Sequence, residues 1–526
     1  MTFDIATMLN PEVYNHPVRN IELIETHISW VILTGDFVYK LKKPVDFGFL
    51  NFSTLEKRHH FCKQELRLNR RLAPAIYLEV VSISGTVEQP RIAGRGEAFE
   101  YAVKMAQFPQ SAQLDQRLAA GELEAEHIDA IAQMVAEFHQ HIDIADDAMD
   151  YGDNAVIYQP VSENFCQIRE HLDTTPYTDA LIALETWSEC AFDKLKPVLR
   201  QRKQDGFVRE CHGDMHLRNM VWLESGPTAF DCIEFNAHLR WIDVISEVAF
   251  LIMDLQARQQ PPLASRFLNR YLEITGDYAG LGVLPFYLCY RAMVRAKVAA
   301  LRHSQENIKA DEKQNTLEDF ELYLRLAGSY TQPASPKLII MRGMSASGKS
   351  TVSQQLLDTM GLIRIRSDVE RKRLFAVPLS ESTLTKQEPD KIDAGIYSPQ
   401  ATQQTYAKLA ELASQVIAAG YSVIVDAAFL KKEQREPFQH LARQAGVSYT
   451  VLEITAPLEL LRQRISEREH DISDADLSVL EHQISHWQPL SDDEKSSAIA
   501  VNTAEKLNLK SLIEVINSHR GKHGQL

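Results

Sequence analysis

Residues 211–219, with the sequence CHGDMHLRN, bring a cysteine, two histidines, an aspartate and an asparagine close together in the chain. Side chains of these types occur in metal centres, in hydrolases and in sites that transfer phosphoryl groups. A second stretch, GMSASGKST at residues 343–351, combines glycines, a lysine and hydroxyl groups in a way that also favours phosphate binding. The chain therefore has two separate candidates for phosphate chemistry.

The second stretch matches the phosphate-binding loop pattern Gly-x4-Gly-Lys-Ser. It stands between an apolar run at 337–342, expected to be a strand, and a segment expected to be a helix from about 348. Backbone N–H groups of such a loop cradle phosphates, while Lys349 would reach the β and γ phosphates and Ser350 would hold Mg²⁺. The residues predicted to bind nucleotide in this loop are Gly343, Ser345, Ala346, Ser347, Gly348, Lys349, Ser350 and Thr351.

Further charged residues follow the predicted strands of this region. Asp368 comes after the second strand, where an acceptor hydroxyl would lie, and it is predicted to be a general base. Asp426 ends the run VIVD and is predicted to steady Mg²⁺. Arg462, Arg464 and Arg468 are predicted to form a lid over the transferring phosphoryl group, with a solvated helix face as the alternative.

The spacing within residues 211–219 argues against a zinc site. Cys211, His212, Asp214 and His216 stand too close in sequence to surround one tetrahedral ion, and no complementary Cys/His pair occurs elsewhere. The GxSxG turn of many hydrolases is also absent from the sequence.

The same stretch fits the catalytic loop of the protein-kinase pattern. In that pattern the catalytic Asp precedes a metal-binding Asn by five residues, which is the spacing of Asp214 and Asn219, and His212 also has its counterpart. A second metal-binding Asp is needed downstream, and TAFDCIEFN supplies Asp231. Asp214 is therefore predicted to accept the proton of the acceptor hydroxyl, and Asn219 and Asp231 to bind Mg²⁺.

The motifs HGDMHLRN, FDCIEFN and WIDVISEVAF together resemble the aminoglycoside phosphotransferase and choline kinase family, a branch of the protein-kinase-like fold. The resemblance covers roughly residues 20–325 and implies ATP as phosphoryl donor. It also implies that Lys40, in FVYKLKK, anchors the nucleotide phosphates and that Glu65 pairs with this lysine. Lys42 is the alternative anchor.

Residues 337–526 resemble the small-molecule P-loop kinases, the group of gluconate kinase, polynucleotide kinase and zeta toxin, through the RSD element around Asp368 and the arginines near 464. This resemblance implies transfer of the γ-phosphate of ATP to a hydroxyl. The two halves together resemble a bacterial fusion family that carries both kinds of domain.

These observations predict two domains joined by a linker. Residues 1–330 are expected to form a two-lobed, protein-kinase-like α+β domain, with strands first and helices after about residue 123. Residues 331–336 lie in the Pro- and Ser-rich stretch SYTQPASP and are the expected linker. Strands and helices alternate in residues 337–526, which predicts a P-loop α/β domain with a parallel sheet and helices on both faces.

Composition limits the possible partners. The chain has 526 residues and a formal net charge of −15, which disfavours nucleic acid and anionic membranes as partners. The sequence shows neither a secretory leader nor a bilayer-length apolar run, so a cytoplasmic enzyme is expected. The six cysteines are scattered and are expected to be buried, reduced thiols.

Charge also bears on the acceptors, which are expected to be small molecules with a hydroxyl group. Most of the negative charge lies before residue 337, which favours a cationic acceptor in the first domain. Arginines flank Asp368 at positions 364, 366, 371 and 373, which favours an anionic acceptor, such as a sugar acid, in the second domain. The alternative is a regulatory protein in which one domain is a nucleotide switch, or a protein kinase acting on the other domain.

Overall fold

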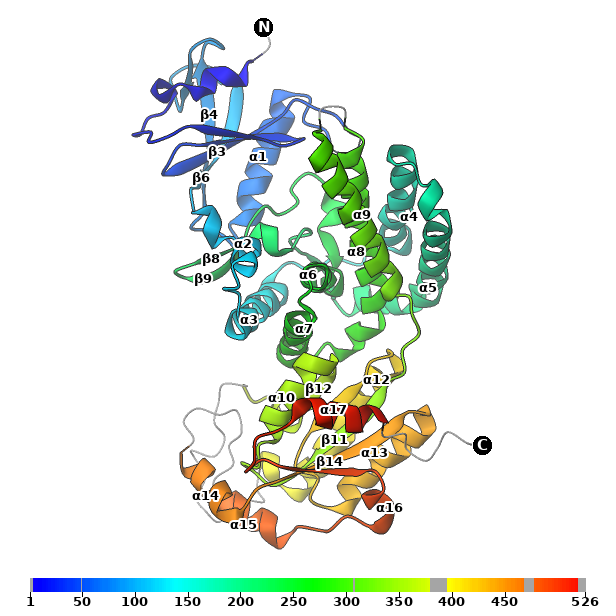
Figure 1. Ribbon diagram of the computed structural model, residues 1–526. Helices are drawn as coiled ribbons and strands as arrows, with labels where there is room; N and C mark the ends of the chain where they lie inside the picture. Colours follow the sequence, from blue (N-terminus) through cyan, green and yellow to red (C-terminus); the bar gives the residue numbers. More distant parts are fainter. Residues whose placement is uncertain (1–2, 49, 306–307, 379–394, 468–476, 519–526) are drawn as a thin grey trace. The chain divides into compact units, whose positions relative to one another are not determined.

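The computed structural model describes residues 3–48, 50–305, 308–378, 395–467 and 477–518 (Figure 1). Contacts divide the chain into two compact units. The first unit consists of Met1–Arg258 and Phe286–Tyr330, and the second consists of Gln259–Pro285 and Thr331–Leu526. The second unit therefore includes a segment that precedes the expected linker.

The first unit begins with a strand-rich lobe. Its six-stranded sheet has the order β1-β2-β3-β6-β4-β5, and every neighbouring pair is antiparallel. The strands are β1 (Glu22–Glu25), β2 (Ser29–Leu33), β3 (Phe37–Lys42), β4 (Tyr77–Gly85), β5 (Pro90–Ile92) and β6 (Glu100–Ala106). Helix α1 (Leu55–Asn69) contacts β4 and β6, and its first turn is capped by the Thr54 side chain, which accepts from the Lys57 N–H.

Helices dominate the second lobe of this unit, as predicted. The longer ones are α3 (Ala125–His141), α4 (Asn154–His171), α5 (Thr178–Gln204), α6 (Val244–Ala257), α8 (Leu284–His303) and α9 (Ala310–Ser329). Helix α6 is buried along almost its whole length, because its sequence, VISEVAFLIMDLQA, is apolar around most of its circumference. Two short antiparallel strand pairs flank the CHGDMHLRN stretch. They are β7 (Val208–Glu210) with β10 (Trp241–Asp243), and β8 (Met220–Leu223) with β9 (Gly226–Ala229).

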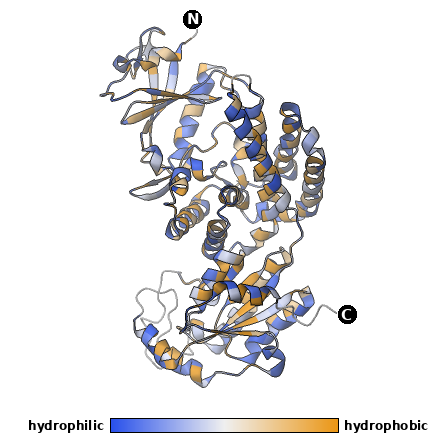
Figure 2. Ribbon diagram, viewed as in Figure 1, coloured by the Kyte–Doolittle hydropathy of each residue, from blue (hydrophilic) through white to orange (hydrophobic). Residues whose placement is uncertain are grey.

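The second unit contains the predicted parallel sheet, with the strand order β12-β13-β11-β14-β15. Its strands are β11 (Lys337–Arg342), β12 (Ile363–Arg366), β13 (Val423–Asp426), β14 (Ser448–Thr455) and β15 (Ala498–Asn502). The strands are mostly apolar (Figure 2), as expected for a sheet that is covered on both faces.

Helices cover both faces of this sheet. Helices α10 (Lys349–Met360) and α17 (Leu509–Ser518) share one hydrophobic core with Ile339 and Met341 of β11. Side chains alternate along a strand, so α12 (Pro399–Ala418) and α13 (Lys432–Ala445), which also contact β11, cover the opposite face. The predicted fold class is therefore confirmed for this unit.

The remaining helices of the second unit lie around this sandwich. They include α7 (Pro261–Thr275), α11 (Ser367–Leu374), α14 (Leu458–Ser466), α15 (Leu477–Ser485) and α16 (Asp492–Lys495). None of the helices in the described ranges is both long and apolar enough to cross a bilayer. The prediction for the cysteines is wrong in part, because Cys166 and Cys190 are exposed on helices of the first unit whereas the other four are buried.

Candidate active sites

The CHGDMHLRN stretch forms a tight loop in which Asp214 and Asn219 face each other. The Asn219 side-chain amide donates to Asp214 Oδ2 (2.8 Å) and to the Asp214 carbonyl (3.0 Å). His216 Nε2 lies 3.4 Å from Asp214 Oδ2. Burial raises the pKa of Asp214, but the nearby His216 and Arg295 outweigh it and hold this pKa well below its usual value. Asp214 is therefore ionised at neutral pH, as a proton acceptor must be.

A buried carboxylate on α6 holds this loop in place. Glu247 accepts from the backbone N–H groups of His212 (2.6 Å) and Gly213 (2.9 Å), and His139 Nε2 lies 3.2 Å away. Gly213 has φ 90°, and a Cβ atom there would lie 2.8 Å from the Leu239 carbonyl oxygen, so only glycine fits. Two further charged side chains bond the loop backbone, because Asp254 accepts from the Leu217 N–H (3.0 Å) and Arg291 donates to the Gly213 carbonyl (3.1 Å). The loop geometry thus depends on a glycine and on buried charged side chains.

His139, Cys211 and Glu247 place their ligand-type atoms within 4.8 Å of one another, all buried. The Cys211 thiol donates to the Ile242 carbonyl at 3.6 Å, and burial raises its pKa well above the usual value. The Cys211 thiol and the Glu247 carboxylate are thus both engaged by backbone groups, and these contacts indicate that the cluster supports the loop.

Asp231 lies at the end of the second short hairpin, directly beyond β9. Its backbone has φ 64°, and its N–H donates to the Tyr77 hydroxyl (3.1 Å). Lys40 Nζ lies 2.5 Å from Asp231 Oδ1 and 2.8 Å from Glu65 Oε1. The structure therefore brings together Lys40, Glu65 and Asp231, which are far apart in the sequence.

Lys42 also contacts Glu65, but from the buried side. Lys42 Nζ lies 2.7 Å from Glu65 Oε2 and pairs with Glu234, and the Lys42 side chain is fully buried whereas that of Lys40 is 13% exposed. Burial alone would raise the pKa of Glu65, but the two lysines bring it down to about 2. Of the two candidate anchors, Lys40 is the one next to Asp231.

Sequence reasoning missed Glu234 as part of this site. Glu234 stands three residues after Asp231 in FDCIEFN, and its carboxylate reaches the lysine two residues beyond Lys40 on the same face of β3. A chain of buried charges thus links the Asp231 loop to β3 and, through Glu65, to α1. The only signal in the sequence was a second acid close to Asp231.

In the second unit, the predicted phosphate-binding loop connects β11 to α10. A Cβ atom on Gly343 would lie 2.5 Å from the Ile454 carbonyl oxygen, and Gly348 has φ 90°, so both glycines are required by the backbone. Lys349 Nζ donates to the Met344 carbonyl (2.7 Å), across the mouth of the loop. The Ser345 N–H donates to the Gln483 side chain of α15 (2.7 Å), a contact that the sequence did not predict.

The remaining loop residues surround the same turn. Ala346 has φ 62°, and the Ser347 carbonyl accepts from Thr503 Oγ1 (2.7 Å). Ser350 and Thr351 lie in the first turn of α10. Thr503, which follows β15, was also missed, although residues that follow a parallel strand gather at the edge of the sheet where ligands bind.

Asp368 and Asp426 lie at the carboxyl ends of β12 and β13. Asp426 is 6% exposed, and its Oδ2 accepts from Ser353 Oγ (3.2 Å), one turn of α10 beyond Ser350. Burial raises the pKa of Asp368, although Arg366 acts in the opposite direction. A carboxylate with a raised pKa is suited to take up a proton during a reaction.

The predicted lid arginines have different surroundings. Arg464 donates to the Ala346 carbonyl (3.2 Å) and to Thr503 Oγ1 (3.0 Å), beside the phosphate-binding loop. Arg462 pairs with Glu481 of α15 (2.8 Å) on an exposed surface, which matches the alternative of a solvated helix face. Arg468 lies outside the described residues.

Both sites carry ligand atoms that suit a magnesium ion. Mg²⁺ prefers oxygen ligands, mainly carboxylates, hydroxyls and phosphates. In the first unit, Asp231 offers a carboxylate. The side-chain nitrogen of Asn219 donates to Asp214, so the side-chain oxygen of Asn219 is the atom that would bind a cation. In the second unit, the Ser350 hydroxyl and the Asp426 carboxylate are the corresponding groups.

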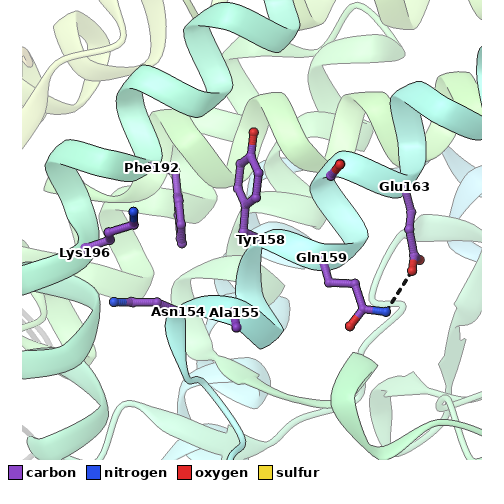
Figure 3. Close-up of a pocket in the computed structure, with 8 residues that line it drawn as sticks. Asn154, Ala155, Tyr158, Gln159, Glu163, Phe192 and Lys196 are labelled. Carbon is purple, nitrogen blue, oxygen red and sulfur yellow. Dashed lines mark hydrogen bonds between the residues drawn. The ribbon is translucent and has the colours of Figure 1, made fainter.

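A hollow of about 560 Å³ lies between α4 and α5, away from every residue predicted to act in catalysis (Figure 3). Tyr158 and Phe192 stack at its centre, with ring centroids 4.6 Å apart, and Gln159 donates to Glu163 at its rim (2.8 Å). None of the residues lining it belongs to the two candidate active sites.

Comparison with known proteins finds two family models that match different parts of the chain. Residues 59–284 match the model of the family described as "Phosphotransferase enzyme family", and residues 338–490 match that of an "AAA domain". An uncharacterized protein of Mycobacterium tuberculosis is 29% identical over 467 residues, which cover 88% of this chain and 90% of the relative. A protein of Mycobacterium bovis, also described as uncharacterized, matches to the same extent.

Solved structures with lower similarity match each half separately. An amicoumacin kinase in complex with AMP-PNP and Ca²⁺ is 13% identical, with a TM-score of 0.39, over 60% of this chain and 90% of that one. A sugar kinase from Janibacter is 21% identical, with a TM-score of 0.26, over 34% of this chain and 92% of that one.

The arrangement of the two lysines predicts different effects of replacing them. Lys40→Met is expected to reduce phosphoryl transfer at the first site strongly with little loss of stability. Lys42→Met leaves Glu65 and Glu234 buried with too few cations, and is expected to lower the free energy of unfolding by about 3–5 kcal/mol. Urea unfolding and ADP release would be measured on both variants. Equal destabilisation by the two substitutions would contradict this difference.

Glu65 also predicts a dependence of stability on pH. Its pKa of about 2 lies below the usual value of a glutamate, so its ionised form stabilises the folded state. This stabilisation is complete above about pH 4.5 and is lost as the pH falls toward 2. Glu65→Gln is expected to flatten this acid limb in urea unfolding curves recorded between pH 2 and 7. An unchanged acid limb would show that Glu65 is not the group responsible.

Proposed function

Since the chain is a phosphotransferase that combines a domain of the phosphotransferase enzyme family with a P-loop kinase domain, we propose that it has two active sites, each of which transfers the γ-phosphate of ATP to a hydroxyl of a small molecule. The observation that carries the proposal is the meeting of Lys40 and Glu65 with Asp231, beside the Asp214–Asn219 pair. The two groups adjoin because the N–H of Phe230, which precedes Asp231, donates to the Asn219 carbonyl (2.9 Å).

At the first site, Asp214 accepts the proton of the acceptor hydroxyl as its oxygen forms a bond to the γ-phosphorus and the bond to ADP breaks. Lys40, held by Glu65, leaves Asp231 to pair with the nucleotide phosphates, and Asn219 and Asp231 hold Mg²⁺. When bound, Mg²⁺ neutralises charge on the transferring group. Glu247 keeps the loop in the geometry that orients Asp214.

At the second site, the loop amides and Lys349 bind the phosphates, and Asp368 takes the acceptor proton. Ser350 and Asp426 hold Mg²⁺, and Arg464 stabilises charge on the phosphoryl group. The Lys349–Met344 and Ser345–Gln483 hydrogen bonds use groups that would turn to the phosphates when nucleotide binds. The two sites thus reach the same reaction with different folds.

The charges around the sites support different acceptors. We propose an anionic acceptor, such as a sugar acid, at the second site, where Arg371 is the best candidate to bind it. Arg364 and Arg366 lie 3.4 Å from Glu273, and Arg373 pairs with Glu370, whereas Arg371 donates to the Ile396 carbonyl (2.6 Å) and stacks on Tyr397. A cationic acceptor at the first site is supported by the acidic composition of that half alone, because Arg295 places positive charge near Asp214.

Two substitutions separate the two activities. Asp214→Asn is expected to lower phosphorylation of first-site acceptors about 10²–10⁴-fold, because a general base contributes that much. Lys349→Ala is expected to abolish second-site activity and leave the first site intact. The full-length variants would be screened against a library of hydroxyl-bearing metabolites, with ADP release and the mass of the products as readouts. Loss of both activities in either variant, or phosphate found on the protein itself, would favour the regulatory or protein-kinase alternative.

Arg371→Ala tests the anionic acceptor. Loss of a charge-assisted contact is expected to raise the Michaelis constant of an anionic acceptor by about tenfold or more and to leave that of ATP nearly unchanged. Arg373→Gln, which removes a neighbouring arginine already paired with Glu370, is the matched control. If Arg371→Ala leaves the Michaelis constants of all acceptors unchanged, the second site does not use this residue to select an anion.

A further inference from the structure

Helix α7 lies within the first domain expected from the sequence, but in the structure it is part of the second unit. Residues 261–275 lie within the range matched by the phosphotransferase family, 59–284, and precede the expected linker at 331–336. In the structure, Gln259–Pro285 is part of the second unit, and α7 contacts α10 and β12. The P-loop unit is therefore built from two separate pieces of the chain.

Helix α7 covers the open edge of the parallel sheet. β12 is the edge strand, and edge strands need partners for their backbone groups. The Asn269 side chain is a partner for both kinds of backbone group, because it accepts from the Arg364 N–H (2.7 Å) and donates to the Leu362 carbonyl (2.9 Å). Ser265 Oγ adds a bond to the Leu357 carbonyl (3.2 Å).

The last turn of α7 places one carboxylate among the arginines near Asp368. The Glu273 side chain is 7% exposed, and its oxygens lie 3.4 Å from Arg364, 3.4 Å from Arg366 and 3.0 Å from Arg270, one turn earlier on α7. The Glu273 carbonyl accepts from Arg373 (2.5 Å). Glu273 is thus the carboxylate shared by the two arginines of β12.

Both of these arginines lead to groups assigned to the reaction. Arg366 stands two residues before Asp368 and acts on it electrostatically. Arg364 lies 3.5 Å from Ser353 Oγ, which donates to Asp426 Oδ2. Loss of the Glu273 carboxylate would leave less negative charge beside both arginines and would strengthen their attraction to Asp368 and Asp426, whose oxygens the reaction needs.

We propose that Glu273 is a positioning residue of the P-loop active site, supplied by a helix that lies within the sequence of the other domain. Glu273 shares the positive charge of Arg364 and Arg366, so that these arginines pair less strongly with the proton acceptor and the metal-binding acid, and Asp368 and Asp426 remain available. This inference rests on the proposed function of the second site. It implies that the P-loop kinase is incomplete without residues 259–285.

The test uses the full-length chain with Asp214→Asn as background, so that turnover of Mg-ATP reports the second site. Glu273→Gln is expected to lower the kcat for ADP release, with water as acceptor, by about tenfold or more and to leave the KM for ATP within about twofold. Glu273→Asp, which retains the charge, is expected to recover part of this loss. Asp358→Asn is the control, because Asp358 of α10 pairs with Arg266 of α7 (3.9 Å) in the same contact.

The outcomes separate the inference from the proposed function. Turnover that persists in Lys349→Ala would overturn the function of the second site. Turnover that requires Lys349 but is equal in Glu273→Gln and the parent would overturn the role of Glu273. Equal loss in Glu273→Gln and Asp358→Asn, with matching drops in thermal stability, would reduce α7 to a structural support. A smaller effect of Glu273→Gln when Arg366→Gln is already present would support the proposed coupling.

Discussion

A charge that leaves water must find a partner, and both active sites are built on this constraint. Glu65 is fully buried, and two lysines of one strand share its carboxylate, one from the cleft and one from the interior. Lys42 in turn holds Glu234, beside the Asp231 loop. Loss of Lys42 would leave Glu65 and Glu234 with too few cations inside the unit, so these pairs fix the relative positions of α1, β3 and the Asp231 loop. The first site owes its geometry to this buried network.

The same principle explains the support beneath the catalytic loop and the edge of the P-loop sheet. Glu247 lies in α6, a mostly apolar helix, and backbone N–H groups of the loop donate to its carboxylate. Glu273 lies at the end of α7, where Arg270, Arg364 and Arg366 donate to its carboxylate. Burial of each carboxylate costs free energy. Hydrogen bonds and ion pairs offset this cost only when the loop backbone or the arginine side chains adopt one particular conformation. Such residues specify geometry more than they add stability.

Local patterns in the sequence were sufficient to identify the two loops to which the proposal assigns the phosphate chemistry. The loop at 343–350 and the Asp214–Asn219 spacing are contiguous motifs, because one turn of backbone must supply several ligands at once. The supporting residues carry no such signal. Glu234 and Glu273 act on residues of other elements, and the fold alone brings them there. The choice between Lys40 and Lys42 also required the structure, since alternation places both on one face of β3. Net charge, an average over the whole unit, did not anticipate Arg295 beside Asp214.

The path of the chain between the units has its own consequence for the architecture. A fusion of two independent domains through one linker would cross from one unit to the other once. Here the chain changes unit after Arg258, after Pro285 and after Tyr330. No single cut can therefore release both units whole. A cut in the expected linker would remove α7 from the P-loop unit, expose the edge of β12 and leave Arg364 and Arg366 without Glu273. A domain boundary drawn from sequence families alone thus divides the second unit. It separates α7, the helix that we propose supports the second site, from the rest of that unit.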